Sequence, residues 1–316
     1  MTTQRTDPDV ASRMGLPPGL PVLRADLTAA TLTDADIRAL RRRDELERIF
    51  RGTYRVGSGP QVPDTRYLAT VRAFADARRH RAAPVIAGPA AVVLHGLPLL
   101  GAPPRLVHVA RAFTGGRSAR GLAMPVGEVP ADQLVTVAGT VSVCAARAAL
   151  DTARLMSVEA GGAAADAALR RGLTTADELA AVVATLRGAR GVARARRCVD
   201  LADGHSESPG ESWSAVVLDR LGIVRPERQE PLYDRAGLIG CAGFWWPGTR
   251  TVGEFDGRVK YGRANPAGRA PLDVLWAEKV REDRLRAVGL GVVRWISADL
   301  RRPLGLARRL AAAFQP

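Results

Sequence analysis

Acidic side chains near residue 255 form the group in the sequence that is best suited to take part in catalysis. In the segment VGEFD, β-strand alternation places Glu254 and Asp256 on the same face. Lys260 follows four residues later, and Glu211 lies near the start of the preceding helix. Carboxylates can hold Mg²⁺ or Mn²⁺, and an ammonium group can stabilise developing charge. The set suits metal-assisted phosphodiester hydrolysis, although an E-x-D pair on a strand can also be a solvated edge or a salt bridge.

The elements that must position these residues lie in the last third of the chain. The segment GESWSAVVLDRLG predicts an amphipathic helix that begins near Ser208. Turn residues then separate the predicted strands, and a long helix, a further strand and a last helix follow in the order αβββαβα. The strands are expected at 228–233, 238–245, 250–256 and 291–297. Trp245 and Trp246 point to opposite faces of their strand, so at least one should be buried.

Charge favours a polyanionic partner. The 316 residues include 46 basic and 32 acidic ones, which gives a net charge of +14 and favours nucleic acid. Only Lys260 and Lys279 are lysines, so a lysine can mark a position that needs a compact ammonium group. Codon bias for arginine and a generic solubility charge are the alternatives.

Several classes are excluded or disfavoured by composition. No apolar run approaches the ~20 residues of a membrane helix, and the first twenty residues lack the apolar core of a secretory signal. Cys144, Cys198 and Cys241 are far apart and lack metal-ligand spacing. We therefore expect a cytoplasmic protein without a membrane partner, a disulfide framework or an organic cofactor.

Residues 21–60 are typical of a small DNA-binding unit. PVLRADLTAA predicts a short helix, and the capping box from Thr33 to Asp36 predicts a second helix over 34–43. A β-hairpin with its turn at Arg51-Gly52 follows. This is the layout of a winged helix, whose second helix enters the major groove of duplex DNA. The arginines expected to contact DNA are Arg38, Arg41, Arg42, Arg43 and Arg51. A solvated arginine face remains the alternative.

Residues 61–200 predict a mixed α/β region after a flexible lead-in at 1–20. Helices are expected over TRYLATVRAFADARR, over an apolar segment that ends at Gly96, and at about 143–155, 162–171 and 175–186. RLVHVAR and QLVTVAGTVSV are predicted strands, and 187–197 is a basic helix or hinge. His95 is isolated from other ligand types and is interpreted as structural.

The C-terminal motifs resemble the PD-(D/E)XK nuclease superfamily, and among its branches the small domains related to the very-short-patch mismatch repair endonuclease. The resembling segments, at about 205–300, are SESPGES, FWWP, EFDG, KY, EKVREDR and VVRW. The resemblance implies a restriction-endonuclease-like domain at 201–316, with Glu211, Glu254 and Asp256 as metal ligands and Lys260 as the catalytic residue. In that superfamily the second strand normally supplies a central aspartate, and here Gly243 stands in its place. Weak binding of Mg²⁺ or Mn²⁺ and slow or absent hydrolysis follow.

The N-terminal portion, at about 21–155, resembles AbiEi-type antitoxins and regulators. The resembling segments are ELERIFRGTYRV, AAVVLHGLP and ARAALDTARL. The resemblance implies a winged helix followed by a regulatory α/β domain that binds promoter DNA of a toxin–antitoxin operon, an arrangement often joined in actinobacteria to a nuclease-like tail.

Three functions remain open at the level of the sequence. The first is a DNA-binding transcriptional regulator with a nuclease-derived domain. The second is an active Mg²⁺- or Mn²⁺-dependent DNA endonuclease of phage defence or repair, and the third is an antitoxin that acts mainly on a partner toxin protein. All three share an α+β multidomain fold with units at 21–60, 61–200 and 201–316.

Overall fold

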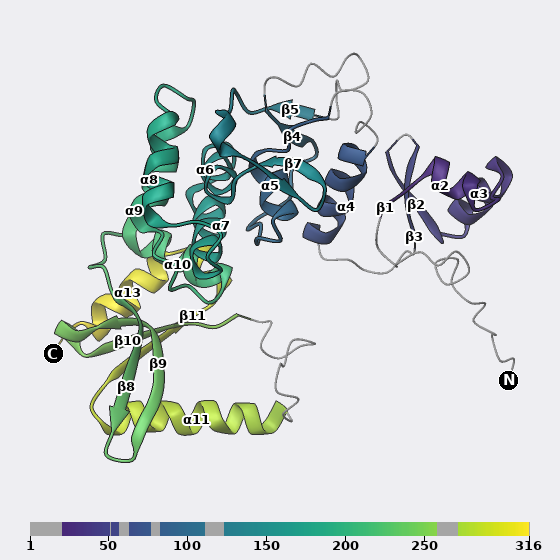
Figure 1. Ribbon diagram of the computed structural model, residues 1–316. Helices are drawn as coiled ribbons and strands as arrows, with labels where there is room; N and C mark the ends of the chain where they lie inside the picture. The colour runs from purple at the N-terminus through teal and green to yellow at the C-terminus, as the bar shows by residue number, and fades with distance from the viewer. Residues whose placement is uncertain are drawn as a thin grey trace, which may run out of the picture.

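The structure is a computed structural model that describes residues 21–50, 52–56, 63–76, 83–110, 123–257 and 271–315. It is a mixed α and β chain with several small sheets. Figure 1 shows an N-terminal unit, a mostly helical middle region and a C-terminal sheet with its helices. The expected lead-in at 1–20 lies outside the described residues. No described helix is long and apolar enough to cross a membrane.

The N-terminal unit is a three-stranded sheet with two helices. Its elements are β1 (Pro21–Leu23), α2 (Arg24–Ala29), α3 (Asp34–Arg42), β2 (Leu46–Phe50) and β3 (Thr53–Val56), and the antiparallel sheet has the order β1-β3-β2. Thr33 caps α3 with the predicted capping box, in which the Thr33 hydroxyl lowers the pKa of the Asp36 carboxyl. The second helix and the hairpin are confirmed. The first expected helix is wrong at its start, because residues 21–23 pair with β3 as a strand.

The middle region packs small sheets against an alanine-rich helical core. Its elements are α4 (Pro63–Asp76), α5 (Gly88–Leu94), β4 (Val107–Val109), β5 (Ala123–Pro125), η2 (Ala131–Gln133), β6 (Leu134–Val137), β7 (Thr140–Val143), α6 (Ala145–Leu155), α7 (Val158–Arg170), α8 (Ala176–Thr185) and α9 (Val192–Leu201). Most expected elements are present. The single strand expected over QLVTVAGTVSV is wrong: Ala138 and Gly139 both take positive φ and turn the chain into a hairpin.

The C-terminal unit is a four-stranded sheet covered on both faces. Its elements are α10 (Pro209–Arg220), β8 (Glu227–Asp234), β9 (Gly237–Trp246), η3 (Pro247–Thr249), β10 (Thr251–Phe255), α11 (Pro271–Ala287), β11 (Gly291–Trp295), α12 (Ser297–Arg301) and α13 (Leu304–Ala313). The strand order is β11-β10-β9-β8, with β10 and β11 parallel and the other pairs antiparallel. The expected αβββαβα order holds up to the last helix. That helix is two helices, because a proline at 303 cannot continue α12.

Two apolar clusters hold the C-terminal sheet between its helices. Trp246 and Trp295 pack with Phe244 and with residues of α10, α12 and α13. A second cluster joins Val252 and the half-buried Trp245 to Leu285 of α11. The expected burial of at least one of the two adjacent tryptophans is confirmed, since Trp246 is 4% exposed.

Candidate functional site

A polar cavity of about 230 Å³ opens beside the sheet of the C-terminal unit. It is lined from α10, β8, β9, β10, α11 and β11 and the segments next to them, by Glu207, Glu211, Gln229, Cys241, Gly243, Glu254, Phe255, Asp256, Arg281 and Arg294. We call it the acid pocket. It brings together all three predicted metal ligands and the glycine that replaces the expected aspartate. Lys260, the predicted catalytic residue, lies outside the described residues.

Strand alternation and close packing set the position of the two neighbouring acids. Glu254 lies in β10, and Asp256 follows the strand with its backbone N–H donating to the Trp295 carbonyl at 2.8 Å. Gly253 precedes Glu254 in β10 and points to the other face, where a Cβ would come within 2.5 Å of the Trp295 ring. The Asp256 carboxylate has no hydrogen bond or ion pair with any residue in the described ranges.

Three donors orient the Glu211 carboxylate. The Ser208 hydroxyl donates to it at 2.8 Å, the Glu207 N–H at 3.0 Å and the Gln229 amide at 3.0 Å. Ser208 is also the N-cap of α10 and accepts from the Glu211 N–H at 3.3 Å. Gln229 has a φ of 52°, a backbone conformation that costs about 1 kcal/mol or more for a non-glycine residue. Such strain is frequent where a side chain must reach a site.

Two arginines occupy the Glu254 carboxylate. Arg281 of α11 hydrogen-bonds Glu254 Oε1, and the Arg294 Nε of β11 lies 3.0 Å from Glu254 Oε2 as an ion pair without hydrogen-bond geometry. Arg281 also donates to the Cys241 carbonyl at 2.8 Å. Arg294 has a second acidic neighbour, Glu282, at 3.3 Å. Both oxygens of the central predicted ligand therefore face guanidinium groups.

The acids as placed do not fit a preformed metal centre. Within the described ranges, no group of three or more His, Cys, Asp or Glu side chains is arranged to hold a metal ion. Glu211 and Glu254 are held by other donors, and Gly243 offers no ligand. A Cβ at Gly243 would have one neighbour, the Gly253 carbonyl at 3.7 Å. This is an ordinary contact distance, so packing alone does not explain the glycine.

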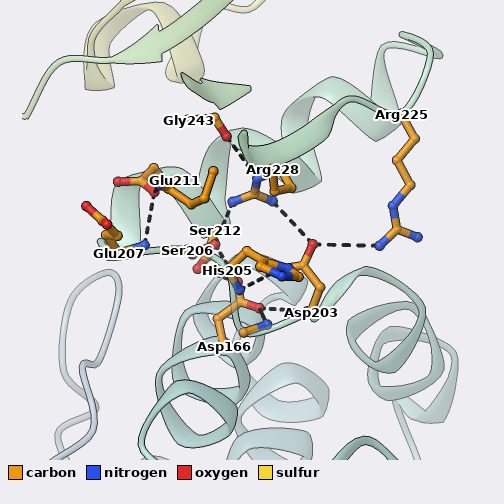
Figure 2. A network of polar contacts seen from close by, with 12 residues as sticks. Asp166, Asp203, His205, Ser206, Glu207, Glu211, Ser212, Arg225, Arg228 and Gly243 are labelled. Atoms are coloured by element: carbon orange, nitrogen blue, oxygen red, sulfur yellow. Dashed lines mark hydrogen bonds and ion pairs between the residues drawn. The ribbon is translucent and has the colours of Figure 1, made fainter. Parts of the chain in front are cut away.

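Behind the pocket, a buried carboxylate of the middle region binds the start of the C-terminal unit (Figure 2). Asp166 of α7 is 3% exposed. Its Oδ2 accepts from the hydroxyls of Ser206 at 2.7 Å and Ser212 at 2.6 Å. Its Oδ1 accepts from the N–H groups of Asp203 at 2.9 Å and Gly204 at 3.1 Å. Asp166 therefore fixes the beginning of α10 against α7.

Arg228 extends this network to the acid pocket (Figure 2). Its Nη2 donates to the Ser206 hydroxyl at 2.7 Å, and its Nε donates to the Gly243 carbonyl at 3.3 Å. The guanidinium also lies 4.6 Å from the centroid of the Phe244 ring. A continuous chain of polar contacts thus runs from α7 to the strand that lines the pocket.

The predicted DNA-contacting arginines are exposed. Arg38, Arg41, Arg42 and Arg43 lie on or just after α3, while Ile37 on the same helix is buried. None of these four arginine side chains has an ion pair or hydrogen bond with another described residue. Arg51 lies outside the described residues.

Sequence reasoning assigned no site role to several residues that the structure places at or near the pocket, although two of them, Arg281 and Arg294, fall within the resembling segments. These are Asp166, Arg228, Gln229, Arg281 and Arg294. Arg294 reaches the pocket because it is directly opposite Glu254 in the parallel register of β10 and β11. The His95 Nε2 lies 2.8 Å from the Val143 carbonyl oxygen, and its interpretation as a structural histidine stays a prediction.

Comparisons with known proteins give relatives without a stated activity. No family model matches the chain. A protein of Mycobacterium tuberculosis, called uncharacterized protein Rv2248 in strain H37Rv and MT2308 in strain CDC 1551, is 32% identical over 180 residues. That match covers 57% of this chain and 64% of the mycobacterial protein, less than two thirds of its length. The crystal structure of the RV2827C protein from Mycobacterium tuberculosis is 19% identical, with a TM-score of 0.36 over 68% of this chain and 84% of that chain.

Proposed function

We propose that the chain is a DNA-binding protein of the regulator or antitoxin type. In this proposal its C-terminal unit is derived from a nuclease but no longer hydrolyses DNA. The observation that carries the proposal is the exposed, unpaired arginine face of α3. Arg38, Arg41 and Arg42 have the spacing that puts side chains on one side of a helix. The helix presents its apolar side to its own small core. In this proposal α3 is the recognition helix of a winged helix, and its arginines contact phosphates and base edges of duplex DNA.

The arginine face predicts a measurable loss of affinity. Replacing Arg38, Arg41 and Arg42 with alanine should weaken binding to a cognate duplex by about 1–3 kcal/mol if one of them reads a base edge. The slope of log affinity against log salt should also fall by about one for each lost phosphate contact. Fluorescence anisotropy with labelled duplex, at several salt concentrations, measures both quantities.

A matched control separates local contacts from bulk charge. Replacing Arg187, Arg302 and Arg308 with alanine removes the same three charges from exposed positions of the middle and C-terminal parts. We expect this control to bind nearly as tightly as wild type at moderate salt. Equal losses in both triple variants would show that net charge, and not α3, accounts for binding.

The second candidate is an active metal-dependent DNA endonuclease. It is favoured by the gathering of Glu211, Glu254 and Asp256 around one pocket. The arginine pairs of Glu254 and the missing acid at Gly243 make it the weaker candidate, because a loosely held ion misplaces the reacting groups. In this candidate Glu211, Glu254 and Asp256 would hold the ion, which would supply Lewis-acid chemistry toward the phosphate. Cleavage of plasmid or mismatched duplex that is lost in Glu254→Ala would favour it.

A further inference from the structure

We propose that Arg281 and Arg294 are the resident cations of the acid pocket, and that they keep a latent divalent-cation site closed. In the wild-type chain they hold Glu254 where a metal ion would otherwise be bound. This inference rests on the geometry of the C-terminal unit and does not require that the protein binds DNA.

The first argument is that the chain is built around Arg281. Its guanidinium bridges Glu254 of β10 and the carbonyl of Cys241 in β9. Gly240 leaves room for it, because a Cβ there would lie 2.8 Å from the Arg281 Nε. Gly240 also has a φ of 145°, which side chains rarely adopt. Two contacts, to Glu254 and to the Cys241 carbonyl, therefore hold the Arg281 guanidinium at the pocket wall.

The second argument is that Arg294 is braced from the opposite side. The parallel register places it beside Glu254, and Glu282 of α11 lies 3.3 Å from its Nη2. Glu282 in turn pairs with Arg286 at 2.6 Å. The result is a row of alternating charges, from Arg281 through Glu254, Arg294 and Glu282 to Arg286. Each acid in the row has two arginine partners.

The third argument concerns the charge that remains. The pocket is lined by four carboxylates and two guanidinium groups. The Glu254 side chain is only 15% exposed, so its ion pairs are less screened than surface pairs. A divalent ion that approached Glu254 would have to break one of them. Once Arg281 is gone, Glu254 would face Asp256 and Glu211 with less competition, and carboxylates of this kind suit Mg²⁺ and Mn²⁺.

The test is Mn²⁺ titration of the full chain without DNA, followed by the electron paramagnetic resonance signal of free Mn²⁺. Arg281→Met removes the charge and keeps the apolar stem. Arg284→Met is the matched control on the same helix, since Arg284 pairs with Asp234 and lies outside the pocket. We expect wild type and the control to bind Mn²⁺ equally weakly. Arg281→Met should bind about tenfold more tightly or better, the size of change that supporting contacts produce at metal sites. Adding Glu254→Gln should abolish the gain.

Two results would overturn the proposal. One is an unchanged Mn²⁺ affinity in a folded Arg281→Met variant. The other is a clear loss of Mn²⁺ affinity in Glu254→Gln alone. We expect this variant to keep the weak Mn²⁺ binding of wild type, and a loss would mean that Glu254 already contacts the metal. If Arg281→Met does not fold, Arg294→Met serves in its place with the same expected gain. Neither of these results bears on the DNA-binding proposal, which is tested separately by the anisotropy titration with labelled duplex.

Discussion

Loss of the Asp166 carboxylate should uncouple the start of the C-terminal unit from the helical middle region. In Asp166→Ala, two hydroxyls and two backbone N–H groups lose their acceptor. The Ser206 and Ser212 hydroxyls can rotate toward other acceptors. The N–H groups of Asp203 and Gly204 cannot, because the chain fixes their direction.

The expected cost follows from these four contacts. A buried donor left without a partner costs about 1–3 kcal/mol, and hydrogen bonds to a charged acceptor are worth more than neutral ones. With two fixed donors and two adaptable ones, we expect Asp166→Ala to lower the free energy of unfolding by about 3–5 kcal/mol. Asp166→Asn keeps one oxygen acceptor and should cost about half as much.

Tryptophan fluorescence is a selective assay for this coupling. All five tryptophans lie between residues 213 and 295, so their fluorescence reports on the C-terminal unit, whereas far-UV circular dichroism reports on the whole chain. Urea unfolding should show the tryptophan transition of Asp166→Ala moved to lower urea. Asp177→Ala, which removes an exposed acid at the start of α8, should cost less than about 1 kcal/mol. A tryptophan transition of Asp166→Ala at the wild-type urea concentration would refute the docking role of Asp166.

Two further predictions concern the pocket strands and the middle region. Gly243→Asp should change the unfolding free energy by about 1 kcal/mol or less, because its Cβ has room. Gly253→Ala should lower it by more than about 2 kcal/mol, because its Cβ overlaps the Trp295 ring. Comparable melting temperatures for the two variants would contradict the packing argument. Burial lowers the pKa of His108 from 6.5 to about 4. Between pH 6.5 and pH 4 the unfolded chain therefore binds more protons than the folded chain. The free energy of unfolding falls as the pH drops through this range, by up to about 3 kcal/mol in total. Urea unfolding at pH 7 and pH 5 should show about 2 kcal/mol of this loss in wild type, because pH 5 is still above the folded pKa, and a smaller loss in His108→Gln.

The sequence could predict features that depend on neighbours along the chain. Alternation was enough to place Glu254 and Asp256 at one pocket, and the capping box at Thr33 was enough to begin α3 correctly. The arginine partners of Glu254 could not be found this way. They lie 27 and 40 residues along the chain from it, and 44 of the 46 basic residues are arginines, so neither stood out. Asp166 was missed for the same physical reason, since its partners lie about 40 residues away and meet it only through packing of α7 on α10.

Two of the three corrected elements differ from expectation because of strand pairing that the local sequence did not indicate. The alternation on both sides of Ala138-Gly139 predicts one strand, but both residues adopt positive φ and reverse the chain. The local sequence predicts residues 21–23 as the start of a helix, but they pair instead with β3, a partner about thirty residues further on. In both cases pairing between strands outweighed the local preference of the segment.

The most direct test of the account is a single gel experiment on supercoiled plasmid with wild-type protein, in Mg²⁺, in Mn²⁺ and in chelator. The account predicts that the protein retards the plasmid at the same protein concentration in all three conditions, at equal ionic strength, and leaves it uncut. Nicking that requires the metal, disappears with chelator and is lost in both Glu254→Ala and Lys260→Ala would contradict it, because the acid pocket would then be a working metal centre.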